Sequence, residues 1–323
     1  MREEFDLVSK VLVLDNDPAS HEAIKAFCDA NHLVGLKVQP DSVMAVLRSN
    51  VDLGGILLSE NYDGRDQGGI QLANRIHAIR SELPIFLRRE NLTTLDDIAP
   101  VDRKALSVAY TLSDINNLQS VISEYIFSLA YPNVLVRGIA EITQTALESQ
   151  FKGMDVDVAA PYIVRDRLIY GEIFTLIPIE SSWCRGYMML QTEELALLEL
   201  VKAERTHISV EDGFGFRNLN AVLGEVTNLV WGAFKNRYMS DATRSAHLSQ
   251  VPIVINHLHR YISFGSDNPQ LCFKYSLSEP GENGRRLDLY QKFVFNLNWT
   301  PEDFTENQTS VHDLVESGEL DLF

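Results

Sequence analysis

Lys10-Val-Leu-Val-Leu-Asp-Asn-Asp-Pro18 is the stretch that decides the fold of the first part of the chain. Its apolar, β-branched run predicts a buried strand over residues 10–15, and the amphipathic pattern behind it predicts a helix over 18–31. The same alternation continues through residues 1–131, and at this spacing it predicts a parallel, doubly wound α/β sheet. Further strands are expected at 55–59, 84–87 and 109–112, and further helices at 69–80 and 115–129.

The pattern changes at Pro132, which predicts a second domain over residues 132–299. Strand-like segments now follow one another, and the turn Glu279-Pro-Gly-Glu-Asn-Gly284 joins the last two as a hairpin. This half is therefore expected to be α+β, with a mostly antiparallel sheet. Helices are expected at 134–150, 193–204 and 221 to about 246, and strands at 155–159, 168–179, 183–190, 251–255, 262–264, 270–277 and 287–297.

Composition excludes several classes of protein. The formal net charge of −17 argues against nucleic acid or an anionic membrane as a partner and favours a partner with a basic surface. The sequence has no long apolar run and no signal-peptide pattern at its start, so we expect a cytoplasmic protein without a membrane span. The three cysteines are isolated from one another, which indicates neither a zinc site nor a disulfide framework.

Residues 300–323 contain no basic residue and several acidic ones, so this segment is expected to be a flexible, solvating tail. Apolar spacing returns near its end, which leaves open a linear motif that folds on a partner. The last residues, Leu320-Asp-Leu-Phe323, resemble the regulator-binding tail of the phosphatase CheZ.

The first domain resembles the receiver domains of response regulators, beginning with the strand that ends at Asp15, Asn16 and Asp17. In receivers, an acidic pair at this place binds magnesium, and the third strand ends in the aspartate that is phosphorylated. Here Ser59 stands in the place of that acceptor, and Ser113 in the place of the lysine that ends the fifth strand. Because acyl-phosphate formation needs a carboxylate nucleophile, a divalent ion and a cation, the resemblance implies a pseudo-receiver without this chemistry.

Two alternatives stay open for this domain. Glu60, directly after Ser59, is a substitute carboxylate acceptor. The segment 81–90 also resembles the receiver-like domain of bacterial ornithine and arginine decarboxylases, which serves assembly, but no pyridoxal-phosphate domain follows it here.

The second domain contains Ala221-Val-Leu-Gly-Glu-Val-Thr-Asn-Leu-Val-Trp-Gly-Ala233. Its apolar residues have helical spacing, which leaves an outer face with Ala221, Glu225, Asn228 and Gly232. This face offers one carboxylate and one amide between small residues. Taken alone, Glu-x-x-Asn is a weak signal, and a solvated helix surface is the ordinary interpretation.

The order of elements around this motif, with Gly232 and Pro252 behind it, resembles the CheC/CheX/FliY family of chemotaxis phosphatases over residues 133–298. The resemblance implies that Asn228 orients a water molecule toward the phosphoaspartate of a separate CheY-type response regulator, while Glu225 pairs with the regulator's lysine. It implies no cofactor of the chain's own, because the Mg²⁺ belongs to the regulator. Where the family has Asp or Ser four residues before the glutamate, this chain has Ala221.

Glu141 and Gln144 repeat the same spacing on the preceding helix, and they are either a second site of the same kind or ordinary helix surface. His257 and His259 flank Leu258 without a third ligand, so no metal site is expected. A homodimer is implied by the resemblance to CheX-type proteins.

The sequence therefore predicts a CheX-like phosphatase for the phosphoaspartate of a separate response regulator, fused to a pseudo-receiver. The alternative from a different class is a non-catalytic adaptor that binds a receiver through the same helix.

Overall fold

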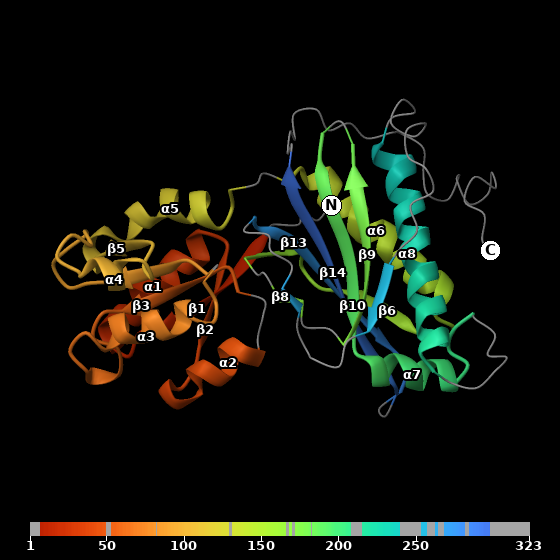
Figure 1. The fold of residues 1–323 in the computed structure, drawn as a ribbon, viewed down its shortest axis with the longest axis horizontal. Coiled ribbons are helices and arrows are strands. Elements are labelled where there is room, and N and C mark those ends of the chain that lie inside the picture. The colour runs from red at the N-terminus through yellow and green to blue at the C-terminus, as the bar shows by residue number, and fades with distance from the viewer. Residues whose placement is uncertain are drawn as a thin grey trace.

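The computed structural model describes residues 7–49, 53–81, 83–128, 131–165, 168–169, 172–181, 183–207, 215–239, 253–256, 262–263, 268–281 and 284–297. The predicted tail at 300–323, together with Pro252, His257 and His259, lies outside these residues. The molecule has two halves that lie side by side, as Figure 1 shows. Among the described residues, no helix is both long enough and apolar enough to cross a membrane.

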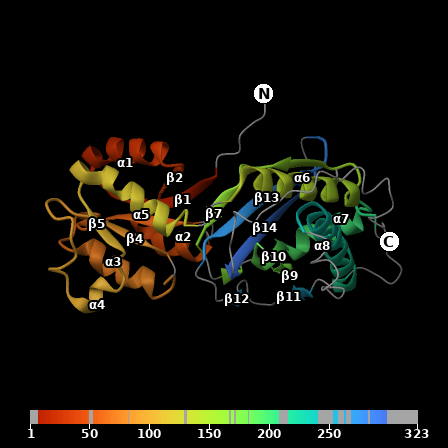
Figure 2. The same cartoon turned by 90° about the horizontal axis from the view of Figure 1, so that it is seen from above.

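The first half is the predicted parallel α/β sheet, with strand order β2-β1-β3-β4-β5. Helices α1 and α5 cover one face of this sheet, and α3 and α4 lie on the other (Figure 2). Its elements are β1 (Val8–Leu14), α1 (Pro18–Ala30), β2 (Leu33–Lys37), a 3₁₀ turn (Pro40–Ser42), α2 (Val43–Ser49), β3 (Gly55–Ser59), a 3₁₀ turn (Tyr62–Gly64), α3 (Gly68–His77), β4 (Ile85–Arg88), α4 (Pro100–Arg103), β5 (Val108–Tyr110), a 3₁₀ segment (Leu112–Asn117) and α5 (Leu118–Tyr125).

The second half is α+β, and the strand pairings within it are antiparallel, as predicted. The long strands β9, β10, β14 and β13 follow one another in space, and helices α6 and α8 pack against them. Its elements are α6 (Asn133–Gln150), β6 (Asp155–Val158), β7 (Tyr162–Val164), β8 (Leu168–Ile169), β9 (Ile173–Glu180), β10 (Arg185–Thr192), α7 (Glu194–Lys202), α8 (Phe216–Tyr238), β11 (Ile253–Asn256), β12 (Ile262–Ser263), β13 (Gln270–Ser278) and β14 (Arg286–Leu297).

A short parallel ladder between β1 and β7 joins the two halves into one sheet, because Val8 pairs with Tyr162 and Ser9 with Ile163. On its other side β7 pairs with β13, so a path of paired strands runs from β11 at one end to β5 at the other. Strands β2 and β6 pair beside this path, and β8 and β12 pair with each other in a separate small sheet. The Ser9 hydroxyl donates a hydrogen bond of 2.7 Å to the carbonyl of Ile163 and fixes this junction.

The hydrophobic core follows the sheet across the junction. One cluster of buried side chains contains Val11 and Phe86 of the first half together with Leu135 of α6 and Phe293 of β14. A separate cluster fills the opposite face of the first half, beneath α2 and α3. The two halves thus share one sheet and one buried cluster.

The sequence did not predict β2, α2, α4 or β7. In β2 only Leu33 is buried, so the strand lacks the alternation that marks a half-buried strand. Helix α2 and strand β7 have 7 and 3 residues, which is too short for a periodic pattern. Several predicted elements also end early: α3 stops at His77, α5 at Tyr125 and β5 at Tyr110. Helix α8 stops at Tyr238, after which Met239 has an extended backbone.

Gly54 generates a test of the junction. A Cβ atom at this position would lie 2.0 Å from the Ser9 hydroxyl oxygen, so Gly54→Ala must displace Ser9 and weaken its bond to Ile163. We expect a loss of about 1–3 kcal/mol in the free energy of unfolding, measured by chemical denaturation of the full chain.

Gly224 provides the matched control, because no atom lies within 4 Å of a Cβ built there. Gly224→Ala is expected to be neutral or to stabilise the helix by about 0.5–1 kcal/mol. Adding Ser9→Ala to Gly54→Ala should recover part of the loss, since the hydroxyl that collides is then gone. Equal stability of wild type and Gly54→Ala would contradict the role given to this contact.

Candidate functional site

Helix α8 carries the strongest candidate site, and its local sequence explains its position. At its start the backbone N–H of Gly215 donates to the side-chain oxygen of Asn218 at 3.0 Å, and at its end the indole of Trp183 donates to the carbonyl of Tyr238 at 3.1 Å. Both contacts satisfy backbone or capping groups that a helix end leaves unpaired. Its apolar side is buried against α6, α7 and the sheet, including Val222, Val226, Val230, Ala233 and Phe234.

The predicted outer face of this helix does lie outward. We call Ala221, Glu225, Asn228 and Gly232 the α8 face. Ala221 and Asn228 are exposed, while Glu225 and Gly232 are half-buried. Within the described part of the chain, Glu225 and Asn228 form neither a hydrogen bond nor an ion pair, so both polar groups are available to another molecule.

Glu225 is the electrostatically unusual member of the α8 face. Partial burial raises the pKa of its carboxyl group, because the charged form loses solvation there. Because this carboxylate is already partly desolvated, a charge-assisted hydrogen bond from a cationic group stabilises it more than it would stabilise an ordinary surface carboxylate.

Thr227 orients the α8 face from behind, a role that the sequence analysis missed. Its hydroxyl is fully buried, lies 2.7 Å from the hydroxyl of Thr175 on β9, and donates to the carbonyl of Leu223 at 2.7 Å. The pair fixes the rotation of α8 about its axis and so turns Glu225 and Asn228 toward solvent. The sequence did contain a signal for this role, because the helical spacing places the polar residue Thr227 on the buried side of the helix.

The candidate second pair on α6 is engaged within the protein. Glu141 is exposed, but its carboxylate accepts a hydrogen bond of 3.0 Å from Arg237. The Gln144 amide donates to Glu148 at 3.0 Å and to the carbonyl of Val156 at 3.4 Å. These contacts favour the ordinary helix surface that the sequence left open.

The helices α6 and α8 approach each other closely at Gly138. A Cβ atom there would lie 1.7 Å from the hydroxyl oxygen of Tyr238, so only glycine fits at this crossing. The Tyr238 hydroxyl in turn donates to the carbonyl of Val134 at 3.3 Å. This contact anchors the C-terminal end of α8.

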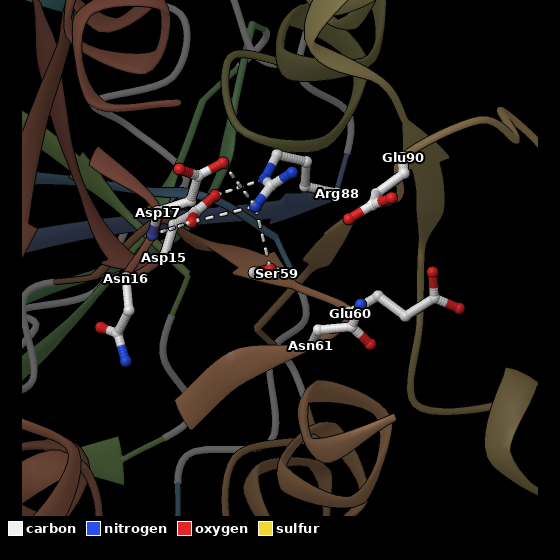
Figure 3. Close-up of a pocket in the computed structure, with 8 residues that line it drawn as sticks. All are labelled: Asp15, Asn16, Asp17, Ser59, Glu60, Asn61, Arg88 and Glu90. Atoms are coloured by element: carbon white, nitrogen blue, oxygen red, sulfur yellow. Dashed lines mark hydrogen bonds and ion pairs between the residues drawn. The ribbon is translucent and has the colours of Figure 1, made fainter. Parts of the chain in front are cut away.

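The first half has an open pocket at the carboxyl ends of β1, β3 and β4 (Figure 3). Asp15, Asn16, Asp17 and Ser59 all line it, so the structure brings these four predicted residues together. Sequence reasoning did not predict the remaining lining residues as a group with them. These are Glu60, Asn61, Arg88 and Glu90.

Arg88 lies at the centre of this pocket, between Asp15 and Ser59 (Figure 3). Its Nε donates to one carboxylate oxygen of Asp15, and its Nη2 donates to the other at 3.1 Å and to the Ser59 hydroxyl at 3.1 Å. Arg88 and Asp15 are both buried. The sequence analysis did not predict this pairing of Arg88 with Asp15.

Glu60, the alternative acceptor, is also paired. Arg89 donates to it at 3.1 Å and holds Asp97 with two further hydrogen bonds, of 2.5 and 2.6 Å. The hydrogen bonds from Arg89 lower the pKa of the Asp97 carboxyl to about 2. Glu60 is thus part of an ion-pair network that joins β3 to the loop after β4.

Ser113 does not line the pocket. Since β5 ends at Tyr110, the residue directly after the strand is Thr111, which is buried. Ser113 is exposed, and its hydroxyl lies 2.9 Å from that of Thr111. The expectation failed because the apolar Leu112 made the strand look longer than it is.

Comparison with known proteins finds no matching family model and no matching curated protein. Solved structures of two kinds are similar to parts of the chain. A CheC-like superfamily protein from Shewanella sp. PV-4 is 17% identical over 49% of this chain and 96% of that one, with a TM-score of 0.36. The chemotaxis protein CheX from Vibrio vulnificus is 17% identical over 49% and 98%, with a TM-score of 0.33.

The second kind is the receiver domain. The N-terminal signal receiver domain of a two-component response regulator from Bacteroides fragilis is 19% identical over 36% of this chain and 96% of that one, with a TM-score of 0.30. The structural neighbours thus include the two kinds of protein that the sequence resembles.

The raised pKa of Glu225 generates a test of the α8 face. A carboxyl whose pKa is higher in the folded state makes the fold less stable as pH rises from the ordinary glutamate value through the raised one. Glu225→Gln should therefore raise the free energy of unfolding slightly at neutral pH and leave it unchanged near about pH 3, where both states are protonated.

The measurement is chemical denaturation of the full chain across this pH range. Glu199→Gln on α7 is the control, because Glu199 is also a helical glutamate but is exposed and not half-buried, so this variant should show no such gain at neutral pH. A pH-independent effect of Glu225→Gln would contradict the assignment to desolvation.

Proposed function

We propose that the α8 face binds a phosphorylated response regulator and hydrolyses its phosphoaspartate. The observation that carries the proposal is the unpartnered pair on this face: an exposed amide at Asn228 and a partly desolvated carboxylate at Glu225, one helical turn apart. The resemblance of the sequence to the CheC/CheX/FliY family gives each group its role.

Hydrolysis of a phosphoaspartate does not need a strong base on the α8 face. An aspartyl phosphate is an activated acyl phosphate, so its hydrolysis depends mainly on placing a water molecule in line with the bond that breaks. The water oxygen attacks phosphorus, the bond to the aspartyl oxygen breaks, and the water protons are shared between solvent and the inorganic phosphate released. An amide side chain such as that of Asn228 can hold this water by hydrogen bonding.

Glu225 supplies the anchor. Its carboxylate can form a charge-assisted hydrogen bond with a lysine of the regulator, which fixes the register of the two proteins. Gly224, Ala221 and Gly232 surround the pair with small side chains, and the space beside Gly224 is open. A helix with this surface lets another protein approach closely.

The substrate belongs to a separate protein. Both views of the molecule place α8 at the end of the second half that faces away from the first half (Figures 1 and 2). At the acceptor position, the pocket of the first half holds Ser59, whose hydroxyl accepts from Arg88, and not an aspartate. The Mg²⁺ that the reaction requires is then the regulator's own.

The alternative is an adaptor that binds a receiver without hydrolysing it. Ala221 favours this alternative, because the family has a polar residue at its place and Ala221 offers no such contact. The homodimer implied by the CheX resemblance is a further part of the proposal, and light scattering on the full chain measures it.

The test of hydrolysis follows phosphate release from phosphorylated CheY-type regulators in the presence of Mg²⁺. The full-length protein should accelerate release, and Asn228→Ala should slow the accelerated rate about a hundredfold, because the water loses its positioning group. Glu225→Ala should act mainly on binding and raise the regulator concentration needed for half-maximal rate.

Asn220→Ala is the matched control, since Asn220 is an exposed amide on the same helix but off the α8 face. It should leave the rate unchanged. If wild type and the Asn228→Ala/Glu225→Ala double variant release phosphate at the same rate while only wild type binds the regulator, the adaptor is correct and the phosphatase is not.

A further inference from the structure

The pocket of the first half lies where a receiver binds a divalent cation, so we asked whether its residues can hold one. The receiver resemblance implies a divalent cation at the acidic end of β1, held by Asp15 and its neighbours. A magnesium site needs oxygen ligands with free lone pairs in near-octahedral arrangement. The contacts around Asp15 show whether the residues of this chain provide them.

They do not, because Arg88 occupies both oxygens of the Asp15 carboxylate. Its Nε and Nη2 bind the two oxygens as a fork, and the Asp17 backbone N–H adds a third hydrogen bond of 3.0 Å. The guanidinium also reaches the Ser59 hydroxyl, which stands at the acceptor position. One cation thus contacts the ends of two neighbouring strands, β1 and β3, while its own strand is β4.

The Arg88 guanidinium keeps its positive charge. Burial alone would lower the pKa of Arg88, but the hydrogen bond and the charge of Asp15 outweigh that effect and raise it. A guanidinium stays protonated under all conditions in which the protein folds. A divalent ion entering beside it would meet like charge at short range in a poorly solvated site.

The remaining acidic groups of the pocket do not replace Asp15. One oxygen of Asp17 caps α1 by accepting from the N–H of Ala19 at 3.0 Å, and the other lies 3.9 Å from Arg88. Glu60 is held by Arg89. Among the described residues, no group of three or more His, Cys, Asp or Glu side chains is arranged to hold a metal ion.

We propose that the Arg88 guanidinium is a built-in replacement for the divalent cation of a receiver, so that this pocket excludes Mg²⁺ and holds β1, β3 and β4 in one fixed arrangement. On this proposal, the first half binds no metal because Arg88 occupies the site, and not only because Ser59 stands where a receiver has its acceptor aspartate. Removing that residue should reopen the site.

The test uses Mn²⁺, whose electron paramagnetic resonance signal weakens when the ion binds to protein. Titration of the full-length wild type should show no site that depends on Asp15. Arg88→Ala frees both Asp15 oxygens and should create a site that binds Mn²⁺ at least tenfold more tightly than any Asp15-dependent binding in wild type. Adding Asp15→Asn to Arg88→Ala should abolish the gain, which separates this pocket from ions collected by the acidic surface.

Arg89→Ala is the matched control, because it removes a neighbouring buried guanidinium and frees Glu60 but leaves Asp15 paired with Arg88. It should gain no comparable site. Far-UV circular dichroism checks that each variant is folded. Arg88→Met, which keeps the apolar length of the side chain, serves if Arg88→Ala does not fold.

Two results would overturn the proposal. One is Mn²⁺ binding by wild type that disappears in Asp15→Asn, because the pocket would then accept a metal with Arg88 in place. The other is a folded Arg88→Ala or Arg88→Met variant that binds Mn²⁺ no better than wild type. The wild-type titration decides the first result even if neither Arg88 variant folds.

Discussion

Two residue pairs between β1 and β7 hold this molecule together, and the rest of the architecture depends on them. A parallel α/β sheet and an antiparallel sheet are different solutions to covering an apolar face, and each normally closes on its own helices. Here the first strand of one extends past β3 and pairs with a short strand of the other. The helices α1, α5, α6 and α8 consequently cover one continuous layer of apolar side chains.

The pocket of the first half and the α8 face differ in whether their carboxylates are paired with a cation. In the pocket of the first half, Asp15 and Glu60 are each neutralised by an arginine, and the ion pairs serve the fold. On the α8 face, Glu225 is partly desolvated without a partner, which costs stability instead of adding to it. An unpaired, partly buried carboxylate that the fold does not use is the kind of group that binding surfaces retain. This contrast is why the proposed function lies with α8 and not with the pocket.

The parts of the fold that sequence reasoning predicted are those with a strong local pattern. The fully buried, largely apolar β3 and the long amphipathic α6 and α8 are examples, and the outward position of Asn228 followed from the spacing of α8. Interactions between distant segments could not be predicted in the same way. Arg88 reaches Asp15 only because β3 brings β1 and β4 close together, and the two residues are 73 positions apart in the chain. Thr227 likewise contacts Thr175 on β9, which lies 52 residues earlier in the chain.

The shared core has a consequence for how this protein unfolds. Two domains joined by a linker lose their structure in separate transitions, each with its own stability. Leu135 of α6 and Phe86 of β4 instead belong to the same buried cluster, so loss of either half uncovers apolar surface of the other. We therefore expect the two halves to unfold as one cooperative unit, so that a destabilising change in the first half lowers the melting temperature of the half that carries α8.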